Sequence, residues 1–351
     1  MYKILIRPFL FLIDPEGSHD FVLNIVSKFN FVYPLFKFFY SPGKNDEVEI
    51  CGIKFKNRLG LAAGFDKNGI AIRFWEALGF SHVEVGTVTP LPQSGNVKPR
   101  IFRLKKDLAL INRLGFNNKG ADEIKKNIFE AKKNTAKNFI VGVNIGKNKD
   151  TPIKDAFVDY KICFEKLYDA ADYFTINISS PNTEGLRKLH EEEYLDKLLS
   201  ELQILNSNIS KLKSTANKCI FLKIAPDLNH EIIELVYKLA VKNKIDGIIA
   251  TNTTVERKVL KSGIDEHGGL SGKPLKSMSG KVLKKLYEMN KKNSKTPLIF
   301  IGVGGVFSIK DFNEKIHFGA SLVQVYTGFI YEGPSIIKKV LLKPAEFKEI
   351  T

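Results

Sequence analysis

Cysteine is scarce in this sequence of 351 residues, which contains only Cys51, Cys163 and Cys219. Because no two of them form a CxxC pair, the sequence indicates neither a disulfide scaffold nor a cysteine zinc site, and it suits a reducing compartment. No apolar run reaches the ~20 residues that a membrane-spanning helix requires. Neither a small-residue cleavage site nor an Arg- and Ser-rich leader is evident, so we expect no secretory signal and no transit peptide.

Acidic residues are too few to balance the basic ones, since 38 Asp+Glu stand against 54 Lys+Arg and leave a formal net charge of +16. Most of the cations are lysines in short runs, whereas arginine, which binds bases and phosphates through paired hydrogen bonds, is scarce. We therefore expect a solvated lysine-rich surface and no nucleic-acid partner. Hydrophobic residues make up 44% of the chain, which is enough to bury a substantial core and excludes extensive disorder.

The first forty residues are rich in phenylalanine and other apolar side chains. We expect two short helices there, over residues 3–12 and 18–28, with Ser18 as the N-cap of the second. Their apolar positions are too many for one buried stripe on a small helix pair. Basic residues flank them. We therefore favour a helix pair that lies in a membrane interface, the alternative being a pair packed only on the main domain.

From residue 47 onward, short apolar runs alternate with helical stretches. After a small hairpin over 48–50 and 53–55, eight strand–helix units follow. The expected strands cover 59–62, 82–88, 139–145, 173–178, 219–224, 247–251, 298–303 and 321–326. The pattern predicts an α/β protein, a (β/α)8 TIM barrel with a small N-terminal helical extension, rather than an open doubly wound sheet. We divide the chain into an extension, 1–43, and a barrel domain, 44–351.

Polar residues recur where the expected strands end, which is where barrels carry their active sites. Glycines in the segment 302–305, together with Tyr326-Thr327-Gly328, suit a phosphate-binding cup. Lys67 and Lys223 offer cations to an anionic ligand or to a cofactor ring that gains negative charge. No His/Asp/Glu trio with metal-ligand spacing occurs there, so we expect no metal. No GxSxG elbow exists and no histidine follows a strand, so a serine hydrolase is poorly supported.

Nine sequence blocks carry a resemblance to a known family. They are 60–67, 112–118, 144–152, 177–187, 223–227, 250–254, 268–272, 302–305 and 320–328. Together they resemble the dihydroorotate dehydrogenase family, flavin enzymes of pyrimidine synthesis. The soluble class of that family uses a cysteine as its base and lacks the N-terminal helices. This chain has Ser180 at that point and begins with the aromatic helix pair, so it resembles the membrane-associated, quinone-dependent class (class 2).

The resemblance implies FMN in the barrel mouth, dihydroorotate as substrate, orotate as product, and a membrane quinone, ubiquinone or menaquinone, as electron acceptor. Ser180 would be the catalytic base, with Thr183 and Phe116 orienting it. The substrate-binding residues implied are Lys67, Asn112, Arg113, Leu114, Gly115, Phe116, Asn177, Asn182, Asn252 and Thr253. Those implied for the cofactor are Ala63, Gly64, Phe65, Asp66, Lys67, Thr87, Asn144, Asn177, Lys223, Thr251, Gly272, Gly305, Tyr326 and Thr327. Those implied for the quinone are His19, Arg103 and Tyr326.

Two other function classes stay open at this point. One is a soluble flavin oxidoreductase that uses fumarate or a nicotinamide partner. The other is a non-enzymatic basic module that binds a membrane surface or nucleic acid. We expect a monomer that is peripheral to the inner membrane of a bacterium, on the cytoplasmic side where basic flanks meet anionic lipid, rather than a mitochondrial protein.

Overall fold

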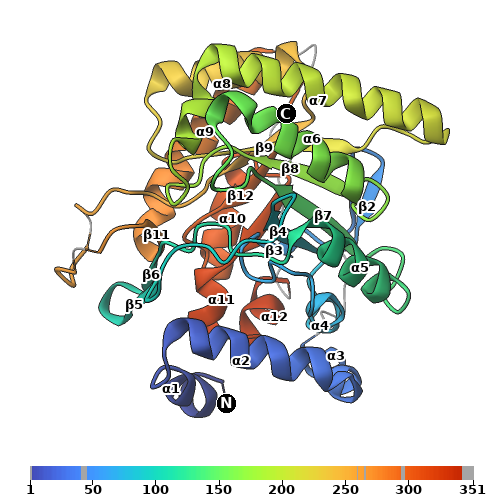
Figure 1. Cartoon of the computed structure of the whole chain (residues 1–351). Coiled ribbons are helices and arrows are strands. Elements are labelled where there is room, and N and C mark those ends of the chain that lie inside the picture. Colours follow the sequence, from blue (N-terminus) through green and yellow to red (C-terminus); the bar gives the residue numbers. More distant parts are fainter. Residues whose placement is uncertain (1, 41–45, 259, 265, 294–296, 342–351) are drawn as a thin grey trace.

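The computed structural model describes residues 2–40, 46–258, 260–264, 266–293 and 297–341. Eight parallel strands close a barrel, and their order around it follows their order along the chain (Figure 1). The strands are β3 (Leu59–Leu61), β4 (His82–Val88), β7 (Ile140–Ile145), β8 (Tyr173–Asn177), β9 (Cys219–Ile224), β10 (Gly247–Ala250), β12 (Ile299–Val303) and β13 (Leu322–Val325). Nearly every strand residue is buried, as expected where helices cover one face and the barrel core the other. The predicted barrel is confirmed.

An outer ring of helices connects these strands. They are α4 (Ile72–Ala77), α5 (Gly120–Lys132), α6 (Ala156–Leu167), α7 (Glu192–Lys213), α8 (His230–Lys242), α9 (Lys276–Lys292), α10 (Ile309–His317) and α12 (Ser335–Leu341). Short 3-10 helices precede three of them, at η4 (Ile153–Asp155), η5 (Leu186–His190) and η6 (Lys273–Leu275), whereas η3 (Lys105–Asp107) lies in the insertion between β4 and α5. One extra helix, α11 (Thr327–Glu332), follows β13. The helices pack apolar stripes on the outer face of the strands, and a second, smaller apolar cluster that includes Tyr173, Phe221 and Ile301 fills the inside of the barrel.

Two small sheets cover opposite ends of the barrel. The hairpin β1 (Val48–Ile50) and β2 (Ile53–Phe55) buries its side chains among residues at the amino ends of the barrel strands. At the other end, β5 (Ile101–Leu104), β6 (Ala109–Asn112) and β11 (Gly269–Gly272) form an antiparallel sheet. The hairpin was predicted. The three-stranded sheet was not, because its strands come from two insertions about 160 residues apart.

The hairpin is also fixed to the barrel covalently. Cys51, in the hairpin turn, and Cys219, the first residue of β9, form a disulfide, and their Cα atoms lie 6.1 Å apart. The cysteine spacing in the sequence gives no sign of this pair, because the two residues are 168 positions apart. Cys163 is buried and free.

The N-terminal helices lie together against one side of the barrel, near α11 and α12 (Figure 1). They are the π-helix η1 (Tyr2–Ile6), α1 (Arg7–Leu10), α2 (Pro15–Lys28), η2 (Asn30–Val32) and α3 (Tyr33–Tyr40). The Glu16 carboxylate binds the Arg100 guanidinium at 2.7 Å and anchors α2 to the barrel. Although burial disfavours the charge of Glu16, Arg100 keeps the pKa of that carboxyl below its usual range.

Two details of this extension differ from the sequence prediction. Ser18 is not the N-cap, because the Asp14 side chain already accepts the Gly17 N–H at 2.8 Å and Pro15 begins the helix. The hydroxyl of Ser18 instead donates to the Leu10 carbonyl. The helix α3 was not expected. Within the described residues, no helix has the length and apolarity that crossing a bilayer would need.

Candidate active site

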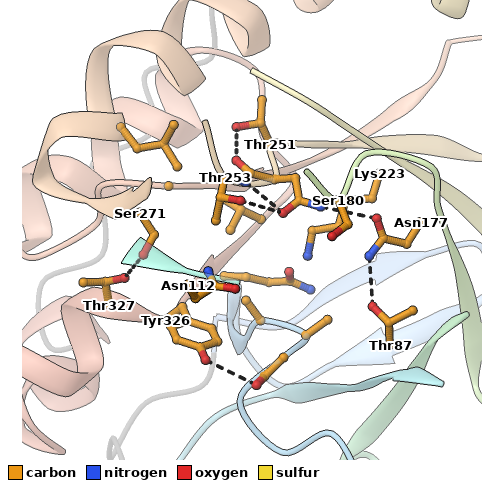
Figure 2. A pocket seen from close by; sticks show the side chains of 18 of the residues that line it. Thr87, Asn112, Asn177, Ser180, Lys223, Thr251, Thr253, Ser271, Tyr326 and Thr327 are labelled. Atoms are coloured by element: carbon orange, nitrogen blue, oxygen red, sulfur yellow. Dashed lines mark hydrogen bonds between the residues drawn. The ribbon is translucent and has the colours of Figure 1, made fainter. Parts of the chain in front are cut away.

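A polar cavity of about 130 Å³ lies at the carboxyl ends of the barrel strands (Figure 2). Most of the site residues predicted from the sequence line it. They are Ala63, Gly64, Lys67, Thr87, Asn112, Leu114, Gly115, Phe116, Asn177, Ser180, Asn182, Lys223, Thr251, Asn252, Thr253, Gly272, Gly305, Tyr326 and Thr327. Parallel strands bring their carboxyl ends to one rim, so residues from distant parts of the chain meet there.

Amide and hydroxyl groups form a connected network across one wall of this cavity. The Asn177 amide donates to the Thr87 hydroxyl at 2.9 Å, and Thr87 donates to the Asn144 side-chain oxygen at 2.6 Å. The Asn252 amide donates to the Asn177 oxygen at 3.3 Å. Among the other lining residues, the Asn182 amide donates to the Asn112 oxygen at 3.1 Å. These contacts fix the amide orientations, so the wall presents a defined set of neutral donors and acceptors.

Ser180 lies in the loop after β8 and its side chain is buried. Its hydroxyl accepts the Asn182 N–H at 3.2 Å, and within the described residues it has no histidine or carboxylate partner. The neighbouring Thr183 hydroxyl is buried and has no hydrogen-bond partner among the residues that the structure describes. A Cβ added to Gly146 would lie 2.9 Å from the Phe116 ring, so the phenyl group is packed tightly beside the cavity. A serine in this setting needs a water or hydroxyl chain to accept its proton.

The two predicted cations differ in their surroundings. The Lys223 ammonium lies 3.6 Å from the carboxylate of Glu84, which is fully buried in the barrel core. The carboxylate also accepts hydrogen bonds from Asn144 at 2.8 Å and Gln324 at 3.0 Å. Lys67 has no ion-pair or hydrogen-bond partner within the described residues. Burial lowers the pKa of Lys67 to about 8, against the opposing effect of Glu16. The cavity therefore contains one cation with a direct ion-pair partner and one that has none within the described residues.

The end of β12 forms a close backbone turn beside the cavity. Gly304 and Gly305 have φ angles of 107° and 76°, a region that favours glycine. A Cβ added to Gly305 would lie 2.4 Å from the Cα of Lys276, so no larger residue fits. Beside it, Ser271 and Thr327 share a hydrogen bond of 2.7 Å (Figure 2). Exposed backbone groups and hydroxyls of this kind suit a phosphate.

A second cavity of about 220 Å³ separates the N-terminal helices from the barrel. Its walls are mostly apolar, and His19, Arg103 and Tyr326 all line it, as predicted. Phe11 lines it too, whereas Phe9 and Phe21 point to solvent. Burial and the nearby Lys67 ammonium lower the pKa of His19 to about 3, so its imidazole is neutral. Tyr326 borders both cavities, and its hydroxyl donates to the Gly64 carbonyl at 3.3 Å.

Four of the residues implied for the substrate or the cofactor do not line the polar cavity. Arg113 turns away to bind the Glu266 carboxylate at 2.6 Å. Phe65 packs between the His19 and Tyr326 rings and lines the apolar cavity instead. Asp66 is fully buried and accepts the Trp75 indole N–H at 2.9 Å, so it holds its own loop. Asn144 lies beneath the cavity, where its side chain accepts a hydrogen bond from Thr87 and donates one to Glu84.

Sequence reasoning missed three polar residues of the site. Glu84 and Gln324 are fully buried in the barrel core, and Ser271 lines the cavity from β11. A signal existed for Glu84, because a lone carboxylate in an otherwise apolar parallel strand must have a buried partner. Ser271 lies within the block 268–272 that carries the family resemblance, but no role was assigned to it and its strand was not predicted.

Comparisons with known proteins agree with this geometry. The family model described as dihydroorotate dehydrogenase matches residues 46–346. A protein of Vibrio parahaemolyticus named dihydroorotate dehydrogenase (quinone) is 48% identical over 96% of this chain and 98% of its own length. One of Christiangramia forsetii with the same name is also 48% identical, over 99% of both chains. A crystal structure of the Eimeria tenella enzyme in complex with ferulenol has a TM-score of 0.85 and 38% identity, covering 93% of this chain and 90% of that one.

Proposed function

Because the chain belongs to the dihydroorotate dehydrogenase family, we propose that it oxidises dihydroorotate to orotate with FMN and passes the electrons to a membrane quinone. The observation that carries the proposal is the pair of cavities that share Tyr326, one polar and one apolar. A polar site for the pyrimidine and an apolar site for the quinone must both border the electron carrier. Two cavities that meet at Tyr326 would place the pyrimidine, the electron carrier and the quinone next to one another.

The polar cavity suits dihydroorotate, an anionic ring with carbonyl and N–H groups. Asn112, Asn177, Asn182 and Asn252 present amides to such a ring, and Thr253 adds a hydroxyl. Lys67, which has no partner within the described residues, would bind the carboxylate. Ser180 would take the proton from ring carbon five and pass it along a water or hydroxyl chain, for which the unpartnered Thr183 hydroxyl is positioned nearby.

The residues on the other side of the cavity fit FMN. The turn at Gly304 and Gly305, with Thr327 and Ser271, would bind the phosphate. Lys223 would lie at the pyrimidine end of the flavin and stabilise its negative charge after reduction. When bound, FMN supplies the chemistry that side chains lack, accepting a hydride from the substrate and releasing electrons to the quinone.

The N-terminal extension, residues 1–43, would admit the quinone and bind the membrane, while 44–351 form the catalytic domain. Most of the large hydrophobic side chains exposed within the described residues belong to the first forty residues, among them Leu12, Phe31 and Phe38, each 73% exposed or more. Such a surface suits the interface of a bilayer. We propose a peripheral monomer on the cytoplasmic side of a bacterial inner membrane.

Absorbance spectroscopy of the purified full-length protein tests the substrate assignment. We expect a bound flavin with a band near roughly 450 nm that dihydroorotate bleaches and a soluble quinone restores. A flavin that stays oxidised with dihydroorotate would refute the substrate. Deleting residues 1–40 separates this proposal from a soluble flavin oxidoreductase, because quinone reduction should collapse while bleaching by dihydroorotate remains.

A further inference from the structure

We propose that Cys51 and Cys219 form a reversible thiol–disulfide site that locks the β1–β2 hairpin onto the barrel. This inference is independent of the proposed function, because the pair lies at the amino ends of the strands, away from both cavities. Cys219 is the first residue of β9, while Lys223, on the same strand, borders the polar cavity. The site therefore lies at the opposite end of the barrel from the candidate chemistry.

The backbone positions the two cysteines for a bond. Their Cα atoms are 6.1 Å apart, within the range of roughly 4.4–6.8 Å that disulfides span. Cys51 and Gly52 have φ angles of 52° and 72° and form a two-residue hairpin turn. Such turns favour Asn, Asp or Gly at their first position, because a larger side chain is strained there. The strained residue in this turn is a cysteine, and it faces the second one.

One of the two cysteines is accessible to a reagent in solution. Cys51 is exposed, whereas Cys219 is buried, with 4% of its surface accessible. A low-molecular-weight disulfide such as oxidised glutathione can therefore reach Cys51. The Cys51 thiolate would attack it, breaking its S–S bond and releasing one thiol. The Cys219 sulfur would then attack the mixed disulfide at Cys51 and release the second thiol. Two protein thiols are oxidised, one external disulfide is reduced, and the two protons leave with the released thiols.

A metal site is the competing explanation, and the ligand set argues against it. The Asp246 carboxylate lies with the two sulfurs, so that all three ligand atoms are within 4.8 Å of one another. Structural zinc sites use four protein ligands, and this group supplies three. One Asp246 oxygen already accepts the Ile220 N–H at 2.8 Å. The donor set is therefore incomplete for a metal but sufficient for a disulfide.

The bond would tether the hairpin that closes the barrel. Ile50 and Phe55 from the hairpin are buried among Tyr173, Phe221 and other residues inside the barrel. Apart from the bond, these apolar contacts hold the hairpin in place. A cross-link over 168 residues removes much of the conformational freedom of the unfolded chain. We expect a rise in Tm of about 5 °C on oxidation.

Counting thiols after denaturation tests the proposal, because the chain has three cysteines in all. We expect one titratable thiol after equilibration with oxidised glutathione and three after reduced glutathione, with the Tm shift following the count. The count of one thiol in both buffers would refute reversibility, and the count of three in both would refute the disulfide. Three thiols with one zinc ion bound per chain after equilibration with Zn²⁺ would establish a metal site instead. One thiol with no Tm shift would refute the tether.

Cys51→Asn is the matched variant, because asparagine suits the turn and should leave folding intact. It should show two thiols and the same Tm in both glutathione buffers. Cys163→Ala is the control, because it removes the buried free cysteine and should retain the full redox-dependent Tm shift. If Cys51→Asn keeps that shift, the bond is not its cause and the proposal fails. The thiol count of the unmodified chain decides the question even if a variant folds poorly.

Discussion

The ion pair between Glu84 and Lys223 gives the sharpest test of the site's electrostatics. Glu84 lies in the barrel core, where its carboxylate meets the Lys223 ammonium at 3.6 Å and accepts hydrogen bonds from Asn144 and Gln324. We consider Glu84→Gln, Lys223→Met and the double variant. Each single change leaves the other charge buried without its oppositely charged partner. The double change removes both charges together.

The structure sets the size of the effect. At 3.6 Å two unit charges attract by about 5 kcal/mol for an effective dielectric constant of 20, and removal of one partner of a buried pair costs about 3–5 kcal/mol. Unfolding entropy near 2.1 cal/mol/K per residue gives about 0.7 kcal/mol/K for 351 residues. Each single variant should therefore lower Tm by about 4–7 °C. The decrease in Tm of the double variant should be much smaller than the sum of the two single decreases.

Thermal unfolding of the four proteins, each with its cofactor bound, measures this coupling. The exposed pair of Lys238 and Glu234, 3.3 Å apart on α8, is the matched control, because a surface pair should show coupling below about 0.5 kcal/mol. If the decreases in Tm of the two single variants simply add in the double variant, the two charges do not stabilise each other. Glu84 would then not compensate the charge of Lys223 beneath the cavity.

Three further predictions concern the proposed function. Ser180→Ala should slow flavin reduction by dihydroorotate about 10²–10⁴-fold in stopped flow while FMN stays bound; unchanged reduction would remove the role of Ser180. The Lys67 ammonium is charged below its pKa of about 8 and loses its proton above it, so the KM for dihydroorotate should rise as pH increases past 8, and Lys67→Met should abolish that rise. Phe31→Ser and Phe38→Ser should each weaken binding to anionic lipid vesicles at least about tenfold, whereas Val97→Ser, at a side chain 87% exposed elsewhere, should not.

The barrel could be predicted from the sequence because each strand is a short apolar run bounded by glycine or polar residues. The strand over 82–88 illustrates this, since its expected and observed bounds coincide. The sheet of β5, β6 and β11 could not be predicted, because its strands are four residues long and pair only after the barrel has brought two insertions together. The N-cap of α2 was misplaced because Asp14 and Ser18 carry equally good capping side chains, and Pro15 favours the earlier one.

The site was more predictable than the contacts that support it. Positions at strand ends converge in any closed barrel, so Thr87, Asn177 and Lys223 could be placed at one rim from their spacing alone. Whether a side chain faces the cavity depends on its partner, which spacing does not reveal. Arg113 follows Asn112 directly, yet it turns outward because Glu266, on a distant loop, offers an ion pair. The roles assigned to these residues remain predictions.

The polar cavity and the apolar cavity lie on either side of two aromatic side chains. Tyr326 and Phe65 form the partition, with the polar cavity on one side and the apolar cavity on the other. Lys67 and His19 line one smaller cavity beside this partition, and burial and the Lys67 ammonium keep His19 neutral, so the imidazole adds no second positive charge there. A group bound in the polar cavity would therefore meet its two reaction partners from opposite sides. Changes at Ser180 and changes in the N-terminal helices should then affect separate half-reactions.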